Sequence, residues 1–334
     1  MSAAPRVDSE VGRLRTVLVH RPGDELAHVD PEHPEAALFG AAMDAAQAAA
    51  EHDALTAALR DGGAEVLEVA ALAADVLGTG DARRAIGAMP NLLYTRDPAF
   101  WVGDGWVAGE MATGQRHDEP ELLARVFTEH PRLAETSRSW TPAGAPRPVV
   151  EGGDVLVPAA GRVAVGVGER TTEAGARALA EALLEGGGAT ELLTLRVPAG
   201  AGFHLDLVLT ALDVDAFAVW APVRDRLQAH VWRWTPSGVT PSAIDDAYRW
   251  LAGGHAAQLV EIAAEPDGHG RPWDHGCNVV ALAPRTVVAY ADNVRANARL
   301  EAAGVTVVAV PGAALAAGRG GPRCLTCPVS RDPL

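Results

Sequence analysis

The pattern of hydrophobic and polar positions divides the chain into short β-branched runs, which predict strands, and longer stretches of helix formers. Residues 14–20 form the first β-branched run, which stops at Arg21-Pro22-Gly23 and predicts a strand followed by a turn. The alanine-rich residues 41–60 predict a helix that ends at a glycine pair, and residues 65–69 predict a short second strand.

The same cycle recurs along the rest of the chain. Further hairpins, each a pair of apolar runs joined by a short turn, are predicted over residues 100–108, 154–167, 207–220 and 278–290. Helices are predicted over residues 119–129, 173–184 and 294–303, and strands near residues 192–195 and 305–310 follow the last two. The chain is therefore predicted to repeat a β-turn-β-α-β unit with a period of about 50 to 70 residues.

Repeats of this length favour an α/β fold built from radial or stacked units over a single Rossmann-type sheet. With the N-terminal unit the count comes to about five, which suits a closed ring of blades. An ordinary α+β domain that contains several hairpins is the alternative fold.

Composition and charge narrow the class of protein. The 334 residues are 48% hydrophobic and 21% charged, which is typical of a soluble globular protein of one large domain or two ordinary ones. The formal net charge of −15 repels nucleic acids and anionic membranes, so we exclude both as principal partners. Three cysteines and the lack of an apolar signal core or a membrane-length apolar run lead us to expect a cytoplasmic protein without a disulfide framework.

Cys324 lies in a glycine-rich stretch, residues 318–328, that has no apolar periodicity. Because such a segment gains little from burial, we expect a mobile loop that presents the cysteine. Arg319 and Arg323 flank Cys324 and predict a positive local field that favours the nucleophilic thiolate. A structural cysteine in a flexible tail is the alternative.

Three carboxylates occupy equivalent places in different repeats. Asp97, Glu151 and Asp206 each stand at the start of a predicted hairpin, although an aspartate before proline, as at Asp97, is also a common turn former. His204 and Asp206 are two positions apart at the start of a predicted strand and should therefore face the same side. In a ring of blades these positions converge, and converging carboxylates need a cation between them.

That cation is either a metal ion or an organic group. A zinc interpretation draws on four side chains, of which the last two have C-x-x-C spacing: His275, Cys277, Cys324 and Cys327. Only one such pair exists, however, and the two arginines beside it would repel zinc. A guanidinium suits the carboxylates better, because its planar fork pairs bidentately with them.

Six motifs, taken together and in this order, resemble those of the arginine deiminases within the guanidine-modifying superfamily. They are residues 91–98 (NLLYTRDP), 151–154 (EGGD), 169–171 (ERT), 204–206 (HLD), 273–278 (WDHGCN) and 318–328 (GRGGPRCLTCP). The resemblance runs from Leu14 to the C-terminus. It implies a five-bladed α/β propeller of ββαβ units in one catalytic domain over residues 1–334, hydrolysing L-arginine to L-citrulline and ammonia without a metal or organic cofactor.

The resemblance also implies roles for individual residues. Cys324 is the nucleophile that attacks the guanidinium carbon, Asp97 and Asp206 hold its nitrogens, and the ring of Tyr94 lies against it. His204, oriented by Glu151, protonates the departing ammonia and then activates water against the covalent amidino-thioether. The substrate α-carboxylate is bound by Asn91, Arg116, Arg170 and Arg319.

One feature departs from the family. Arginine deiminases commonly carry a helical bundle before the Asn-Leu-Leu-Tyr segment, where residues 70–89 leave room only for a helix or two. The departure leaves open the oligomeric state and whether the small-molecule substrate is free arginine. An amidinotransferase, a deiminase of a modified arginine and an inactive guanidinium-binding protein remain alternatives, and Cys277 and Cys327 are predicted to be buried as small hydrophobes.

Overall fold

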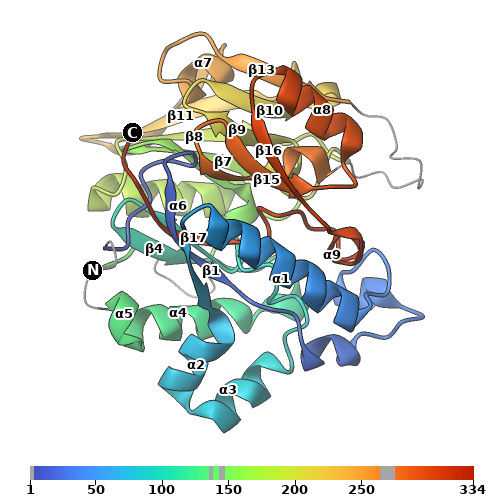
Figure 1. Cartoon of the computed structure of the whole chain (residues 1–334). Coiled ribbons are helices and arrows are strands. Elements are labelled where there is room, and N and C mark those ends of the chain that lie inside the picture. Colours follow the sequence, from blue (N-terminus) through green and yellow to red (C-terminus); the bar gives the residue numbers. More distant parts are fainter. Residues whose placement is uncertain (1–3, 135–137, 143–146, 264–274) are drawn as a thin grey trace.

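The strands of the protein fall into several small mixed sheets, with helices packed around them (Figure 1). The structure is a computed structural model that describes residues 4–134, 138–142, 147–263 and 275–334. Within these residues there are five sheets. The fold is therefore α/β, as predicted.

Four of the sheets share one pattern, in which an antiparallel hairpin is followed by a third strand parallel to the second. Their strands are β3 (Ala99–Val102), β4 (Gly105–Ala108) and β5 (Arg138–Ser139); β6 (Val155–Ala159), β7 (Arg162–Val167) and β8 (Glu191–Arg196); β9 (Leu209–Asp213), β10 (Ala216–Trp220) and β13 (Gln258–Ile262); and β14 (Val280–Ala283), β15 (Thr286–Tyr290) and β16 (Thr306–Val310). The predicted hairpins are thus confirmed.

The remaining sheet joins the two ends of the chain. Strand β1 (Leu14–Val19) pairs in parallel with β2 (Glu65–Glu68) and antiparallel with β17 (Cys327–Arg331). Figure 1 shows the red β17 running alongside the blue β1. The sheet has the same pattern as the others, but its hairpin partner comes from the far end of the sequence, so the segment with Cys324 lies against the first repeat.

Helices occupy the parallel crossovers and the connections between sheets. They are α1 (Ala45–Asp61), α2 (Val69–Leu77), α3 (Thr79–Ile86), α4 (Glu119–Glu129), α5 (Pro131–Ala134), α6 (Glu173–Gly186), α7 (Ala247–Leu251), α8 (Val294–Ala302) and α9 (Ala313–Ala317). Asp44 and Thr172 cap α1 and α6 by accepting from the main-chain N–H of Gln47 and Gly175. None of the helices in the described ranges is both long and apolar enough to cross a membrane.

The helix predictions agree with the structure, including two short helices, α2 and α3, where room for a helix or two was expected. The pattern did not predict the hairpin of β11 (Gln228–Thr235) and β12 (Gly238–Ile244), which extends the second sheet because β11 pairs with β8. Most residues of β12 are exposed or half-buried, so this strand lacks the apolar alternation by which strands are recognised.

The expectation that His204 and Asp206 begin a strand is wrong. His204 has an extended backbone, but Asp206 lies in the 3₁₀ turn η5 (Leu205–Leu207) that precedes β9. The turn is favoured because the main-chain N–H of Leu205 donates to the carboxylate of Asp154 at 2.8 Å, which fixes the chain before the sheet begins. Both side chains are nevertheless fully buried.

Candidate active site

The loops that lead into the sheets bring the predicted carboxylates together. Asp97 comes just before β3, Glu151 precedes the 3₁₀ turn η4 (Gly152–Asp154) that leads into β6, and Asp206 lies in the turn before β9. All three are buried. Asp97 and Glu151 both lie next to the imidazole of His204, and Asp206 lies next to Cys324.

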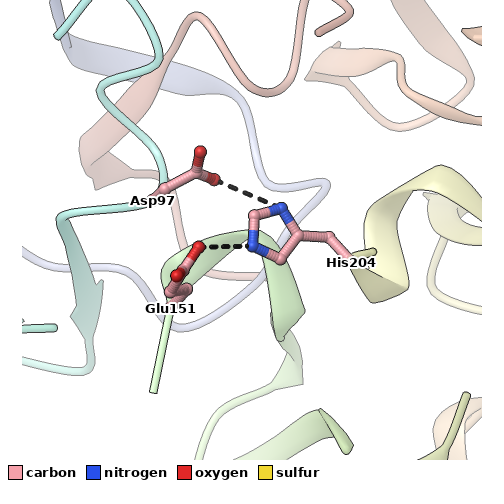
Figure 2. A group of neighbouring side chains, drawn as sticks. All are labelled: Asp97, Glu151 and His204. Atoms are coloured by element: carbon pink, nitrogen blue, oxygen red, sulfur yellow. Dashed lines mark hydrogen bonds and ion pairs between the residues drawn. The ribbon is translucent and has the colours of Figure 1, made fainter. Parts of the chain in front are cut away.

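The imidazole of His204 lies between two carboxylates (Figure 2). Its Nε2 lies 2.8 Å from Glu151 Oε2, and its Nδ1 lies 3.6 Å from Asp97 Oδ1. Gly153 permits this approach, because a Cβ there would collide with the imidazole and with Asp97 Oδ1. Burial alone would lower the pKa of His204, but Asp97 and Glu151 outweigh it and raise the pKa to about 9, so the resting imidazole is protonated.

A metal ion at this site would have to be bound by the same three side chains. Among the described residues, Asp97, Glu151 and His204 form the one group whose possible ligand atoms all lie within 4.8 Å of one another. Because the pKa of His204 is raised, a metal at this position would have to displace a proton from the imidazole. Of the side chains in the zinc interpretation, Cys324 and Cys327 belong to no such group in the described part of the chain.

The two aspartates are each held by an arginine on one oxygen only. Arg116 Nη1 donates to Asp97 Oδ2 at 2.6 Å, and Arg323 Nη1 donates to Asp206 Oδ2 at 2.8 Å. The other oxygen, Oδ1, of each aspartate is buried and accepts no hydrogen bond from any described residue. Buried carboxylate oxygens without donors are costly, so this pair is an acceptor set suited to a cationic N–H donor.

Cys324 is buried beside these carboxylates. Its Sγ lies 3.7 Å from Asp206 Oδ2, and Asn278 Nδ2 donates to the same sulfur at 3.1 Å. Burial, together with Asp206 and Asp97, raises the pKa of Cys324 well above its ordinary value. The prediction that flanking arginines favour the thiolate is therefore wrong, because burial and the carboxylates outweigh Arg323, whose guanidinium bonds to Asp206.

The segment that carries Cys324 is buried, although its lack of apolar periodicity led us to expect that it gains little from burial. Every residue from Gly320 to Ser330 is buried. Gly320 packs against the ring of Tyr94, where a Cβ would collide, so glycine is present here because of close packing. Arg319, just before it, adopts a left-handed backbone with φ of +73°, which is uncommon outside glycine and typical of functional sites.

Several predicted residues line one small cavity with the nucleophile. Its walls are formed by Leu38, Asn91, Tyr94, Asp97, Arg116, Arg170, Phe203, Gly318, Arg319, Gly320 and Cys324. The cavity measures about 20 Å³, which is enough for one water molecule. A larger hollow of about 400 Å³ between α6 and β11 contains none of the predicted site residues.

Arg170 and Arg319 both contact one aromatic residue at the cavity wall. Each guanidinium carbon lies 5.1 Å from the centre of the Phe203 ring. Arg170 Nη1 is also 3.6 Å from Glu151 Oε2, whereas burial and the charge of Arg170 lower the pKa of Arg319. The wall of the cavity around Phe203 therefore carries two positive charges.

Arg116 has different partners from those expected of a carboxylate-binding residue. Besides Asp97, it donates to both oxygens of Glu119, at 2.7 Å for the shortest contact, and to the carbonyl oxygens of Asn91 and Tyr94. These bonds account for each of its guanidinium nitrogens. The guanidinium of Arg116 is thus bonded to Asp97 and Glu119 at the wall of the cavity.

Sequence reasoning assigned no role to four residues that the structure brings to the site, namely Glu10, Asp154, Phe203 and Asn278. Asp154 and Asn278 belong to the quoted motifs, which was a usable signal. Glu10 gives no such signal, because it lies in the segment before β1 and reaches the site only in the fold. Trp273 and Asp274 of the fifth motif lie outside the described residues, and Cys277 and Cys327 are buried, as predicted.

Comparison with known protein families gives one consistent result. The family model described as arginine deiminase matches residues 84–331. The arginine deiminase of Rhodococcus opacus (strain B4) is 36% identical over 100% of this chain and 99% of its own length, and that of Mycobacterium marinum is 36% identical over 98% of both. The first alignment runs to 415 positions against 334 residues here, so that relative has residues without a counterpart in this chain.

Solved structures with a similar fold are more distant in sequence. DDAH from Pseudomonas aeruginosa, in complex with citrulline, has a TM-score of 0.65 and 15% identity, and the match covers 94% of this chain and 99% of that one. The N-terminal domain of ArgZ, an arginine dihydrolase from cyanobacteria, has a TM-score of 0.63 and 14% identity, covering 95% and 97%. At these identities the likeness is one of fold.

Proposed function

The chain belongs to the arginine deiminase family, and on that basis we propose that it hydrolyses L-arginine to L-citrulline and ammonia. The observation that carries the proposal is the pair of buried oxygens, Asp97 Oδ1 and Asp206 Oδ1, that accept no hydrogen bond from the described residues. A substrate guanidinium supplies N–H donors to both oxygens.

Binding of that cation explains how a thiol becomes a nucleophile. In the free protein Asp97 and Asp206 disfavour the thiolate of Cys324. A guanidinium placed against the same carboxylates neutralises them and adds a positive charge next to the sulfur, which lowers the pKa of the thiol. The nucleophile is therefore activated only when the substrate is present.

The first chemical step joins the sulfur to the guanidinium carbon. The thiol proton of Cys324 passes to water as the substrate cation binds. The thiolate Sγ then attacks that carbon, and the resulting tetrahedral adduct expels ammonia as it collapses to the amidino-thioether. His204 supplies the proton to the leaving nitrogen. We assign this transfer to Nδ1, because Nε2 is hydrogen-bonded to Glu151 whereas Nδ1 makes no hydrogen bond with the described residues.

The second step uses the same groups in reverse. Neutral His204 takes a proton from a water molecule that attacks the amidino-thioether carbon, and the carbon–sulfur bond then breaks to release citrulline and restore the thiol of Cys324. Glu151 keeps the imidazole oriented in both steps.

The α-carboxylate of the substrate is assigned to the cationic side of the cavity. Arg170 and Arg319, held on Phe203, provide the charge, and Asn91, whose Nδ2 donates to the carbonyl of Ala37 at 2.9 Å, lies beside them. A cavity of about 20 Å³ is too small for a free amino acid, so the segment with Arg319 must move for entry and return over the carboxylate. Arg116 acts in this scheme by supporting Asp97.

The five sheets of the described residues each contain an antiparallel pair of strands and a third strand parallel to one of them, and this repetition supports a five-bladed α/β propeller in a single catalytic domain. The pairing of β1 with β17 is the contact that closes such a ring.

The proposed function is tested by incubating the purified protein with L-arginine alone and measuring citrulline, ammonia and ornithine together. Citrulline with an equal amount of ammonia is the expected result. Ornithine that forms only after an amine acceptor is added would instead indicate amidino transfer.

A further inference from the structure

Arg323 directly precedes the nucleophile, but its guanidinium contacts other groups. Nη1 donates to Asp206 Oδ2 at 2.8 Å, and Nη2 donates to the carbonyl oxygen of Val155 at 2.6 Å and to Glu10 Oε1 at 3.2 Å. Only 1% of its surface is exposed. Arg323 is thus fixed at three points, and through it the position of Asp206 is fixed as well.

Glu10 balances the charge of this arginine from the opposite side. It comes from the segment before β1, is buried, and lies 3.8 Å from Arg96 as well as 3.2 Å from Arg323. Burial would raise the pKa of Glu10, but Arg323 and Arg96 lower it to about 2, so the carboxylate is ionised. The result is a buried row of alternating charges, Glu10, Arg323 and Asp206, that ends at the site.

We propose that Arg323 is a positioning residue for the substrate guanidinium, and that it acts by keeping Asp206 ionised with Oδ1 available to the substrate. Glu10 holds Arg323 in the required place. The inference rests on the proposed function and names a residue that the mechanism above does not use.

The surroundings of Asp206 show why it needs such a partner. Burial raises its pKa, and the charges of Arg323 and His204 oppose that rise, whereas Asp97 adds to it. The thiol of Cys324 also faces the carboxylate, and Asn278 donates to the carbonyl oxygen of Asp206. Without Arg323, a protonated and rotatable carboxyl group would replace a fixed anion, and a neutral group pairs weakly with a cation.

The test compares Arg323→Met and Arg323→Lys with a matched control, Arg331→Met. Arg331 is equally a buried arginine near Glu10, but its Nη1 donates only to the main-chain carbonyls of Gly12 and Ala281. For each variant we would measure thermal unfolding, kcat and KM for L-arginine over pH, and the Kd of L-arginine in a Cys324→Ala background.

Arg323→Met is expected to raise KM and Kd by about tenfold or more and to move the acid limb of kcat/KM to higher pH. Arg323→Lys keeps the charge and loses the second donor direction, so its effects should be in the same direction and smaller. Arg331→Met is expected to lower thermal stability while leaving KM, Kd and the pH profile unchanged. A purely structural role for Arg323 would give its variants the same result as this control.

An Arg323→Met protein with the KM, Kd and acid limb of the parent would overturn the proposal. If Arg323→Met does not fold, the same comparison with Arg323→Lys decides it. A parent protein that binds L-arginine but releases no citrulline contradicts the proposed function, and the Kd comparison still tests Arg323. A parent that does not bind L-arginine overturns both.

Discussion

Asn278 holds Cys324 at two points, one on the main chain and one on the sulfur. The main-chain N–H of Cys324 donates to Asn278 Oδ1 at 3.1 Å, and Asn278 Nδ2 donates to Sγ at 3.1 Å. The same Nδ2 lies 3.3 Å from the carbonyl oxygen of Asp206. One amide therefore connects the nucleophile with the turn that carries a guanidinium-binding carboxylate, and its N–H favours negative charge on the sulfur.

Replacing Asn278 should reduce the reactivity of the Cys324 thiol more than it weakens substrate binding. We expect Asn278→Ala to lower kcat by about tenfold or more with a smaller change in KM, and to move alkylation of Cys324 by iodoacetamide to higher pH. Asn297→Ala is the matched control. Asn297, in α8, is also buried, but its Nδ2 donates to the carbonyl oxygen of Tyr290. An alkylation profile identical to that of the parent would show that Asn278 does not act on the sulfur.

Replacing Cys324 should affect turnover far more than replacing Cys327, the other cysteine of the C-x-x-C pair. Cys324→Ala is expected to reduce citrulline formation at least about a thousandfold while retaining the fold, because Cys324 supplies the one thiol among the described residues that line the cavity. Cys327 is buried with its Sγ 3.3 Å from the carbonyl of Ala99, so Cys327→Ala should reduce stability and largely preserve activity. Citrulline formation by Cys324→Ala at the parent rate would refute the covalent mechanism.

The role of Arg319 can be separated from general damage by the choice of substrate. We expect Arg319→Ala to lower kcat/KM for L-arginine by about a hundredfold and to have little effect on agmatine, which has no carboxylate. Arg177→Ala serves as a control, since Arg177 is exposed and pairs with Glu181 on the surface of α6. Equal losses with both substrates would remove Arg319 from the carboxylate site.

The acid–base group should lose function at high pH. His204, with its pKa raised to about 9, carries the proton for the leaving ammonia below that pH, so kcat is expected to fall as the pH rises through about 9. The ion pairs of His204 also stabilise the folded protein, and this stabilisation likewise decreases at high pH. It is fully present below the ordinary pKa of 6.5 and is lost as the pH rises through the folded-state pKa of about 9.

Glu151→Gln tests this assignment. Removing a carboxylate that raises the pKa of His204 should move the alkaline limb of kcat to lower pH and reduce kcat by about tenfold or more. Glu169→Gln is a suitable control, because Glu169 is exposed and lies 3.8 Å from Arg170. An alkaline limb that stays in place in Glu151→Gln would mean that another group sets it.

Much of the fold follows from local pattern, because strands that pair within a repeat are marked by β-branched runs and turns. The hairpin of β11 and β12 was missed since its outer strand is mostly exposed and does not alternate. The pairing of β1 with β17 has no local signal either, because register between the two ends of a chain is decided only when the whole chain folds.

The site, like the fold, has parts that the sequence predicts and parts that it does not. Residue type and motif singled out Cys324, His204 and the three carboxylates, and the fold brings these side chains together. The supporting contacts were not predictable, because a charge next to Cys324 in sequence points elsewhere in space: Arg323 bonds to Asp206 and Glu10. For that reason the sequence wrongly predicted a thiolate at Cys324. Burial and two carboxylates far away in sequence, Asp206 and Asp97, raise the pKa of the thiol more than the neighbouring Arg323 lowers it.

The pairing of β1 with β17 ties activity to completion of the chain. Cys324 lies just before β17, and that strand pairs with β1 from the first repeat. A product of truncation or proteolysis that lacks β17 therefore loses the strand that fixes the segment of Cys324 to the first repeat, even if the other four sheets form. We expect such a product to form citrulline more slowly than the intact chain, so clipping at this point lowers the activity of a preparation.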